Sequence, residues 1–405
     1  MAYIGRALEK ELREAARNFS AIILTGPRRA GKTTLLRHLR PHASYWLLED
    51  PEVVARVRAD PRAFLDELRV PAILDEIQNV PEILNHVRAR IDSHPEHKGD
   101  WLLTGSQEAP LMRGVTESMA GRAAVLQLLP LSHAESEKVS LLRGGFPEVL
   151  ARPRAASLWF RSYVQTYLER DVRNVSAIRD LSTFRRFLGL VASRCGQVLN
   201  KSDLAAPLGV SVPTLTDWLG ILETTGQILL VPPYFENFGK RLIKSPKLYF
   251  VDSGLACHLL GIESDAELRR SPFFGPIFEG FVAAEIVKHQ INSAKARQLY
   301  YFRDQQGLEV DFLVPVAAGR VALLEAKAST TVRPEMADPM LRLAQAMQRL
   351  EVASYVVHRA PAGAEAGLTA LRPGVQALTV DAIERIFKQG RTRGDTSPTE
   401  DNAGE

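Results

Sequence analysis

The stretch TGPRRAGKTT at 25–34 constrains the fold more than any other part of the chain, because it directly follows the apolar run AIIL at 21–24. From Gly26 to Thr33 it fits G-x-x-x-x-G-K-[ST], with a buried strand before the loop and a helix beginning at the lysine. The glycines allow successive backbone N–H groups to turn inward around phosphates. The spacing therefore predicts a phosphate-binding loop at the carboxyl end of a strand, in an α/β fold.

The loop residues have distinct expected roles. Lys32 is placed to reach the β- and γ-phosphates of ATP, Thr33 to ligate Mg²⁺, and the helix N-terminus adds partial positive charge. Arg28 and Arg29 either contact phosphate or point to solvent. The predicted nucleotide-binding residues of the loop are Gly26, Pro27, Arg28, Arg29, Ala30, Gly31, Lys32, Thr33 and Thr34.

A second strand supplies the acids that such a site needs. Residues 72–76 read AILDE, an apolar run that ends in two acids. Asp75 would lie at the carboxyl end of this strand, beside the loop, as the second oxygen ligand of Mg²⁺. Glu76 is the expected activator of the attacking water, so the predicted catalytic residues of this site are Lys32 and Glu76.

A third strand, WLLTGS at 101–106, ends in hydroxyl groups. A sensor of the γ-phosphate would lie there. Thr104 and Ser106 are the candidates, with Ser106 preferred, and the alternative for both residues is simple turn chemistry.

The order of the phosphate loop, LDEIQNVP and TGSQ over residues 20–130 resembles the AAA-like ATPases found in a large family of uncharacterised prokaryotic proteins. In this resemblance LDEIQ is the Walker B stretch, and MAGR at 119–122 leads into a strand and an LPLS turn. The resemblance implies that Arg122 contacts nucleotide or a neighbouring subunit, in which case the protein is a homo-oligomer. By sequence alone, Arg122 is equally well a surface arginine.

The middle of the chain predicts a winged helix. After a junction at 143–154, a short capped helix begins at Ser202, Gly209 makes a tight turn, and Ser211 caps a second helix. The run ILLVPPYF then pairs with KLYFVDS. This is the spacing of a helix-turn-helix followed by a wing.

Winged helices contact DNA or serve as dimerisation and interdomain modules. The second helix, LTDWLGILETT, carries two acids and no basic residue, so the wing is the better candidate for a phosphate contact. The basic residues of the wing are Lys240, Arg241, Lys244 and Lys247.

A second acidic group lies near the C-terminus. Periodicity predicts a helix at 276–291 and strands at 298–303, 308–314 and 320–327. Asp311 and Glu325 alternate with apolar residues on adjacent strands, and Glu325 and Lys327 project to one face. Inward acids are costly unless they bind a cation or pair with a base. Glu285 on the helix would complete the cluster, with Glu279 as its competitor.

An acid, then Asp, then Glu-x-Lys resembles the metal-binding constellation of restriction-endonuclease-like nucleases. The resemblance implies that Glu285, Asp311 and Glu325 hold one or two ions, Mg²⁺ or Mn²⁺, and that Asp311, Glu325 and Lys327 are catalytic. The alternative is a surface strand with a salt-bridged Glu and Lys. Over nearly its whole length the chain resembles the family in which an AAA-like ATPase is joined to a winged helix and a nuclease-like domain.

These observations predict an α/β multidomain protein, since 405 residues are too many for one ordinary core. The expected parts are a P-loop AAA-like domain with a parallel sheet, a helical and winged-helix domain, a restriction-endonuclease-like α/β domain and a disordered tail. Their ranges are 1–145, 146–270, 271–389 and 390–405.

Two functions fit these parts. The first is an ATPase coupled to a Mg²⁺-dependent nuclease or nuclease-like nucleic-acid module, with DNA rather than RNA as partner. The second is a nucleotide-dependent switch that binds a protein or DNA without cutting it. The pI near 9.0 is compatible with a polyanionic partner. Since no apolar run reaches the roughly 18 residues that span a bilayer, the expected location is the cytoplasm, with no membrane partner.

Overall fold

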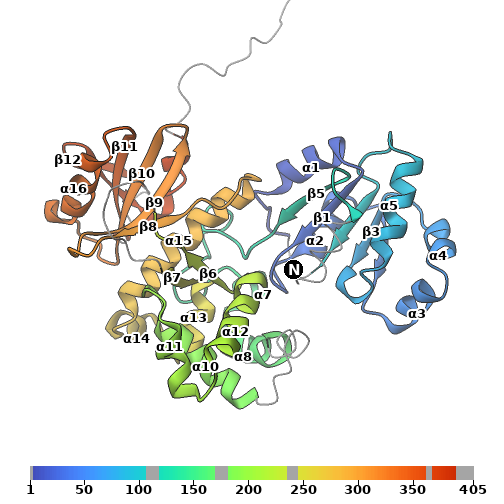
Figure 1. The fold of residues 1–405 in the computed structure, drawn as a ribbon, viewed down its shortest axis with the longest axis horizontal. Coiled ribbons are helices and arrows are strands. Elements are labelled where there is room, and N and C mark those ends of the chain that lie inside the picture. Colours follow the sequence, from blue (N-terminus) through green and yellow to red (C-terminus); the bar gives the residue numbers. More distant parts are fainter. Residues whose placement is uncertain (1–2, 106–117, 169–180, 235–244, 362–366, 389–405) are drawn as a thin grey trace, which may run out of the picture. The chain divides into compact units, whose positions relative to one another are not determined.

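The computed structural model of the 405-residue chain describes residues 3–105, 118–168, 181–234, 245–361 and 367–388 (Figure 1). The chain forms two compact units. The first comprises Met1–Pro232 and Lys244–Gln298, and the second Pro233–Ile243 and Leu299–Glu405. The predicted ranges 1–145 and 146–270 thus share one unit, and the helix predicted at 276–291 belongs to that unit as well. The predicted tail at 390–405 lies outside the described residues.

The N-terminal part of the first unit contains a five-stranded parallel sheet with the order β2-β3-β4-β1-β5. The strands are β1 (Ala21–Thr25), β2 (Ser44–Leu47), β3 (Ala72–Asp75), β4 (Trp101–Thr104) and β5 (Ala123–Gln127). All five residues of β1 are buried, as its continuous apolar sequence predicts for an inner parallel strand. The phosphate loop therefore follows a strand that has a neighbour on each side.

Helices cover both faces of this sheet, and side chains of β1 alternate between two cores. Ile22 and Leu24 pack with α1 (Glu9–Asn18) and α2 (Lys32–Leu39). Ala21 and Ile23 pack in the other core, with the remaining helices of this part. Those helices are α3 (Pro51–Ala59), α4 (Pro61–Glu67) and α5 (Ile83–Ser93).

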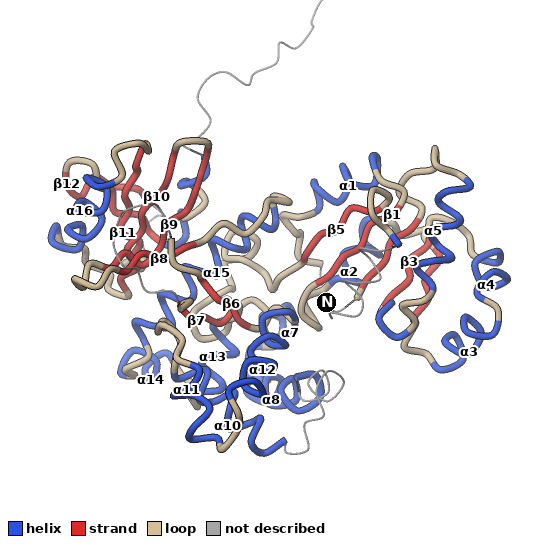
Figure 2. Tube along the Cα trace, viewed as in Figure 1, coloured by secondary structure: helices blue, strands red, loops and turns tan. Residues whose placement is uncertain are grey.

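The rest of the first unit is mostly helical, as Figure 2 shows, with one antiparallel pair formed by β6 (Ile228–Val231) and β7 (Lys247–Phe250). Its helices are α7 (Pro147–Ala151), α8 (Ala156–Tyr163), α10 (Leu181–Ser193), α11 (Lys201–Ala205), α12 (Val212–Thr224), α13 (Ser253–Leu259), α14 (Asp265–Arg270) and α15 (Phe274–Asn292).

The elements expected at 200–250 are present, with one shifted helix start. Ser211 caps α12 by accepting the N–H of Thr214, and Gly209 has a φ of +67° in the turn before it. The first helix begins at Lys201 rather than Ser202, because the side chain of Asn200 caps it. The two helices and the strand pair are therefore confirmed as elements, and the winged-helix assignment stays a prediction.

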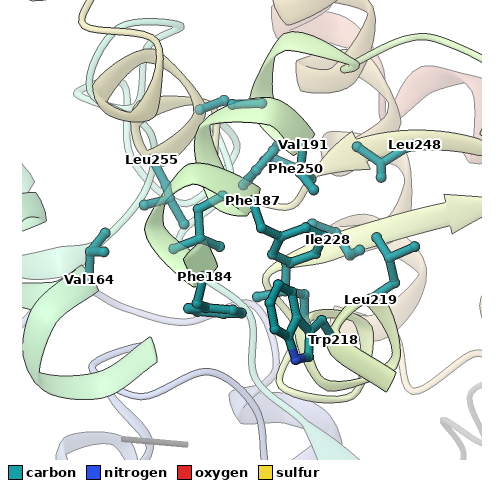
Figure 3. Packing of buried hydrophobic residues seen from close by; sticks show 14 of the residues in the cluster. Val164, Phe184, Phe187, Val191, Trp218, Leu219, Ile228, Leu248, Phe250 and Leu255 are labelled. Atoms are coloured by element: carbon teal, nitrogen blue, oxygen red, sulfur yellow. The ribbon is translucent and has the colours of Figure 1, made fainter. Parts of the chain in front are cut away.

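An aromatic core holds these helices together (Figure 3). The ring of Trp218 on α12 lies 5.4 Å from that of Phe184 and 5.2 Å from that of Phe187, both on α10. Tyr163 is 2% exposed and accepts the side-chain N–H of Gln227. Edge-to-face contacts of this kind fix α10 and α12 against each other.

The second unit is a six-stranded mixed sheet with the order β12-β13-β11-β10-β9-β8, packed against α16. The strands predicted from the sequence are confirmed, and β9 runs three residues further than expected because Ala317 still pairs with Arg320. Pro233 pairs with Tyr301 beside β8. The elements are β8 (Tyr300–Arg303), β9 (Glu309–Ala317), β10 (Arg320–Lys327), α16 (Asp338–Ala346), β11 (Glu351–His358), β12 (Leu368–Arg372), β13 (Val375–Thr379) and α17 (Arg385–Lys388).

Among the described residues, no helix combines the length and the apolar character needed to cross a membrane.

Candidate functional site

The backbone of the phosphate loop requires both of its glycines. Gly26 has a φ of +134°, and a Cβ there would collide with the carbonyl oxygen of Leu128. Gly31 has a φ of +101° and directly precedes α2. Because side chains are disfavoured in these conformations, only glycine allows the loop to turn from β1 into the helix. The loop therefore opens onto the N-terminus of α2, where backbone N–H groups are available to an anion.

Lys32 folds back over the loop. Its side chain is nearly buried, and Nζ donates to the carbonyl oxygens of Gly26 at 2.9 Å and Pro27 at 3.1 Å. The positive charge is thereby kept next to the loop backbone rather than in solvent.

Asp75, the last residue of β3, brings residues of β2 and β4 into the same site. Its Oδ2 accepts the hydroxyls of Thr33 and Tyr45, both at 2.8 Å, and its Oδ1 accepts the hydroxyl of Thr104. Asp75 is 4% exposed and Thr104 is fully buried. The expected meeting of Thr33 and Asp75 is thus present. The hydroxyl of Thr33 and the carboxylate of Asp75 are oxygen ligands of the kind that Mg²⁺ favours.

Thr104, on β4, orients both acids at the end of β3, Asp75 and Glu76. Besides its bond to Asp75, its Oγ1 accepts the backbone N–H of Glu76 at 3.3 Å. Thr104 thus contacts the acids through its hydroxyl. The other sensor candidate, Ser106, lies outside the described residues.

Glu76 has an unusual backbone and a basic neighbour. Its φ of +60° puts a residue with a side chain in the left-handed region, which costs of order 1 kcal/mol and is common at functional sites. Its Oε2 accepts the side-chain amide of Gln78 and lies 3.4 Å from Nη1 of Arg28. Of the two loop arginines, Arg28 is therefore buried against Glu76, whereas Arg29 is exposed.

Tyr45 was not expected at this site. It lies on β2, and the guanidinium of Arg37 is 5.1 Å from the centre of its ring. Partial burial and the hydrogen bond to Asp75 raise the pKa of Tyr45 above its ordinary value, so the phenol stays a hydrogen-bond donor.

A cavity of about 480 Å³ adjoins the loop. Segments far from the loop in sequence complete it, with Tyr3, Ile4 and Arg6 from the N-terminal segment and Leu131 and Pro147 from beyond β5. The full lining consists of Tyr3, Ile4, Arg6, Arg28, Arg29, Ala30, Gly31, Lys32, Thr33, Thr34, Glu49, Glu76, Leu131, Pro147 and Glu148. This volume lies in the range of small-molecule sites.

The position of Arg122 corrects the expected contact with nucleotide bound to the same chain. Arg122 directly precedes β5, which runs parallel to β1 with Ala21 opposite Ala123. It therefore lies at the amino edge of the sheet, whereas the phosphate loop follows the carboxyl end of β1. Its guanidinium makes a two-pronged contact with Asp92, at 2.5 and 3.1 Å. The contact with a neighbouring subunit stays a prediction.

In the second unit, Asp311, Glu325 and Lys327 meet on one face of the sheet, as expected. Nζ of Lys327 lies 2.7 Å from Oε2 of Glu325 and 4.0 Å from Oδ2 of Asp311. The same oxygen of Asp311 accepts the N–H of Ala326 at 2.9 Å. The side chain of Glu325 is 6% exposed, so its charge is offset by the lysine in a nearly buried position.

The predicted third acid, Glu285, has other partners. Its Oε1 accepts Nζ of Lys288 at 3.0 Å and its Oε2 accepts the N–H of His133 at 2.8 Å. Within the described ranges, no three His, Cys, Asp or Glu side chains are grouped closely enough to hold a metal ion. Asp311 and Glu325 come together on the sheet of the second unit, whereas Glu285 belongs to the first unit and is held by Lys288 and His133, so its place in a three-acid cluster stays a prediction.

The competing acid and the basic wing also differ from expectation. Glu279 accepts Nζ of Lys247 at 3.0 Å and the hydroxyl of Tyr249 at 2.5 Å. Because Lys247 is 2% exposed, it is not available to a phosphate backbone. The other three basic residues of the wing, Lys240, Arg241 and Lys244, lie outside the described residues.

Three family descriptions match the chain. An AAA domain covers residues 18–137, and two domains of unknown function cover 135–266 and 274–368. The uncharacterized protein Rv2008c of Mycobacterium tuberculosis is 31% identical over 385 residues, which is 93% of this chain and 85% of that protein. The uncharacterized protein Mb2031c of Mycobacterium bovis matches with the same values.

Two solved structures show a weaker likeness. The Walker-type ATPase PABY2304 of Pyrococcus abyssi is 17% identical with a TM-score of 0.41, covering 62% of this chain and 94% of that one. DnaA from Aquifex aeolicus is 14% identical with a TM-score of 0.26, covering 53% and 85%. At TM-scores below 0.5, neither likeness bears on how this chain is arranged.

Proposed function

The chain belongs to the same family as the two uncharacterized mycobacterial proteins and has an N-terminal P-loop ATPase domain of the AAA type, and we propose that this domain binds and hydrolyses ATP with Mg²⁺. The observation that carries the proposal is the meeting of Thr33 and Asp75 beside the loop that Lys32 covers. Asp75 ends β3, and Lys32 and Thr33 begin α2 after the loop that follows β1, so these groups lie at the carboxyl edge of one parallel sheet, which is where such folds bind ligands.

Each residue then has one task. The loop N–H groups and Lys32 bind the β- and γ-phosphates, and Thr33 and Asp75 hold the ion. When bound, Mg²⁺ offsets charge on the phosphate oxygens. Glu76 orients the attacking water and accepts its proton. Arg28, 3.4 Å from Glu76, sets the direction of that carboxylate.

The remaining wall of the cavity suits the base of the nucleotide. Tyr3, Ile4, Leu131 and Pro147 give it an aromatic and apolar character. The ring of Tyr3 stacks on His38 at 3.7 Å, and its hydroxyl donates to Glu9 at 2.7 Å. A fixed aromatic ring is a surface on which a purine can stack.

Two substitutions separate binding from hydrolysis. Lys32→Ala is expected to remove nucleotide binding and hydrolysis together, whereas Glu76→Gln should still bind ATP but hydrolyse it at least about 100-fold more slowly. Binding is measured with a fluorescent ATP analogue and hydrolysis by phosphate release. Lys10→Ala and Glu82→Gln, which change exposed residues, serve as matched controls. Wild-type hydrolysis by Lys32→Ala would refute the proposal.

For the second unit we propose a restriction-endonuclease-like module that acts on nucleic acid, with DNA preferred. Its support is the meeting of Asp311, Glu325 and Lys327 on one sheet face, together with the order β8, β9, β10, α16, β11. The two acids would hold Mg²⁺ or Mn²⁺, and Lys327 would offset charge at the phosphate that is attacked.

A second candidate function, a nucleotide-dependent switch that does not cut, is favoured by the contact between Lys327 and Glu325. At 2.7 Å the ammonium already neutralises the more buried acid. Labelled duplex DNA, single-stranded DNA and RNA, each with Mg²⁺ or Mn²⁺ and with or without ATP, distinguish the two functions. Cleavage by the wild type that Asp311→Asn abolishes supports the nuclease. Intact substrates beside normal ATP hydrolysis support the switch.

A further inference from the structure

We propose that Arg6 is a positioning residue for the phosphate loop, which it holds from the N-terminal segment of the chain. The inference rests on the nucleotide site proposed above. Arg6 lies before α1 and is 7% exposed, and it also lines the cavity beside the loop.

The guanidinium of Arg6 joins three separate parts of the first unit. Nη1 donates to the carbonyl oxygen of Ala30 in the loop at 2.9 Å, and Nη2 donates to that of Leu129 after β5 at 2.7 Å. Nε donates to Oε1 of Glu135 at 2.9 Å. A planar group whose three nitrogens each donate a hydrogen bond cannot rotate without breaking several of them.

Glu135 supplies the counter-charge and fixes the guanidinium. Its side chain is 2% exposed, and it also accepts the N–H groups of Ala7 at 2.9 Å and Ser132 at 2.8 Å. Burial alone would raise the pKa of Glu135, but the charge of Arg6 and these hydrogen bonds hold it below its ordinary value. Arg6 is therefore anchored independently of the loop.

The hydrogen bond from Arg6 to the carbonyl oxygen of Ala30 determines the direction in which the next backbone N–H of the loop points. The carbonyl of Ala30 and the N–H of Gly31 belong to one planar trans peptide, so they point in opposite directions. By holding that carbonyl, Arg6 fixes the direction of the Gly31 N–H. Because Gly31 has a φ of +101° and no side chain, the peptide would otherwise have much freedom to rotate. Fixing it in advance lowers the entropy lost when phosphate binds.

The test must separate positioning from simple structural support. Arg6→Met alone leaves the buried carboxylate of Glu135 without its partner and is expected to destabilise the fold. The double variant Arg6→Met with Glu135→Gln removes both charges, so its melting temperature should return toward that of the wild type. Its affinity for a fluorescent ATP analogue should still fall by about 10- to 100-fold, since two charged hydrogen bonds to backbone carbonyls are lost.

Arg6→Lys gives a second route to the same answer. It keeps a positive charge beside Glu135 but lacks the planar fork that reaches both carbonyls, so it should also bind the analogue more weakly. Arg13→Met, on the exposed side of α1, is the control that should bind normally. Wild-type affinity in a folded double variant or in Arg6→Lys would overturn the role of Arg6. Failure of the wild type itself to bind would instead overturn the proposed nucleotide site.

Discussion

The acids of the two units are held in different ways, although each lies in or at the end of a β-strand. Asp75 accepts three hydroxyls, from Thr33, Tyr45 and Thr104. Glu325 instead has the ammonium of Lys327 at 2.7 Å. Hydroxyl donors orient a carboxylate and leave its charge in place, whereas an ammonium cancels that charge. The first arrangement therefore suits a divalent ion directly, and the second requires the ion to compete with a resident cation.

Removing the charge of Asp75, the acid that accepts hydroxyl groups, has the largest expected effect. Asp75→Asn is expected to lower ATP hydrolysis by about 100-fold or more and to remove the Mg²⁺ dependence of nucleotide binding. Glu325→Gln should leave hydrolysis within about twofold, because it alters only the other unit. Phosphate release measures ATP hydrolysis, and titration of a fluorescent ATP analogue with and without Mg²⁺ measures the metal dependence of nucleotide binding. Similar losses in the two variants would show that the sites are not independent.

Glu285 is held in a third way, because it is buried and forms an ion pair with a buried lysine. Lys288 and Glu285 both have side chains that are 2% exposed, and Nζ of Lys288 also donates to the carbonyl of Leu131. Lys288→Met should lower the free energy of unfolding by about 3–5 kcal/mol, because it leaves a buried charge unpaired. Adding Glu285→Gln should recover much of this loss. Urea denaturation gives the values, and a change below about 1 kcal/mol would mean that the pair is not buried in solution.

The resident cation of the second unit provides the next test. Lys327→Met should strengthen binding of Mn²⁺ at Asp311 and Glu325 by about tenfold, since the ion no longer competes with the ammonium. Isothermal titration calorimetry measures the affinity, and Lys295→Met, which changes an exposed residue outside this face, is the control. Unchanged or weaker Mn²⁺ binding would remove the distinction between the two kinds of site.

The smallest expected effect is a dependence of stability on pH. Because Arg6 and its neighbours lower the pKa of Glu135 in the folded state, the pair stabilises the fold above the unfolded value of about 4.5. That contribution is lost as the pH falls through the lower, folded pKa. Melting temperatures between pH 6 and pH 3 should thus fall more steeply for the wild type than for the double variant Arg6→Met with Glu135→Gln. Parallel curves would argue against the lowered pKa.

Local spacing in the sequence was enough to find the centre of the nucleotide site. The loop, the Thr33–Asp75 pair, the Ser211 cap and the β6–β7 strand pair all follow from patterns that span few residues or from adjacent strand ends. Arg6 and Tyr45 were missed because neither belongs to a motif, and their contacts with the loop, Glu135 and Asp75 form only in the folded chain. Only the folded sheet brings those positions together.

The settings of Arg122 and Glu285 depend on strand direction and on a local ion pair. Because β5 runs parallel to β1 in the folded sheet, Arg122 lies at the edge opposite the loop, and the sequence alone does not give this strand direction. Glu285 has Lys288 three positions later on a helix, a spacing typical of an ion pair.

The way in which Pro233 pairs beside β8 decides whether the second unit is a separable part. The chain passes between the two units at 232, 243 and 298, so the second unit is assembled from two stretches of sequence. The N–H of Tyr234 donates to the carbonyl of Tyr301 at 2.7 Å, next to the edge strand of the sheet. A fragment that starts at residue 299 would expose this edge to aggregation. The C-terminal unit is therefore not a cassette that gene truncation or recombination can transfer at a single junction.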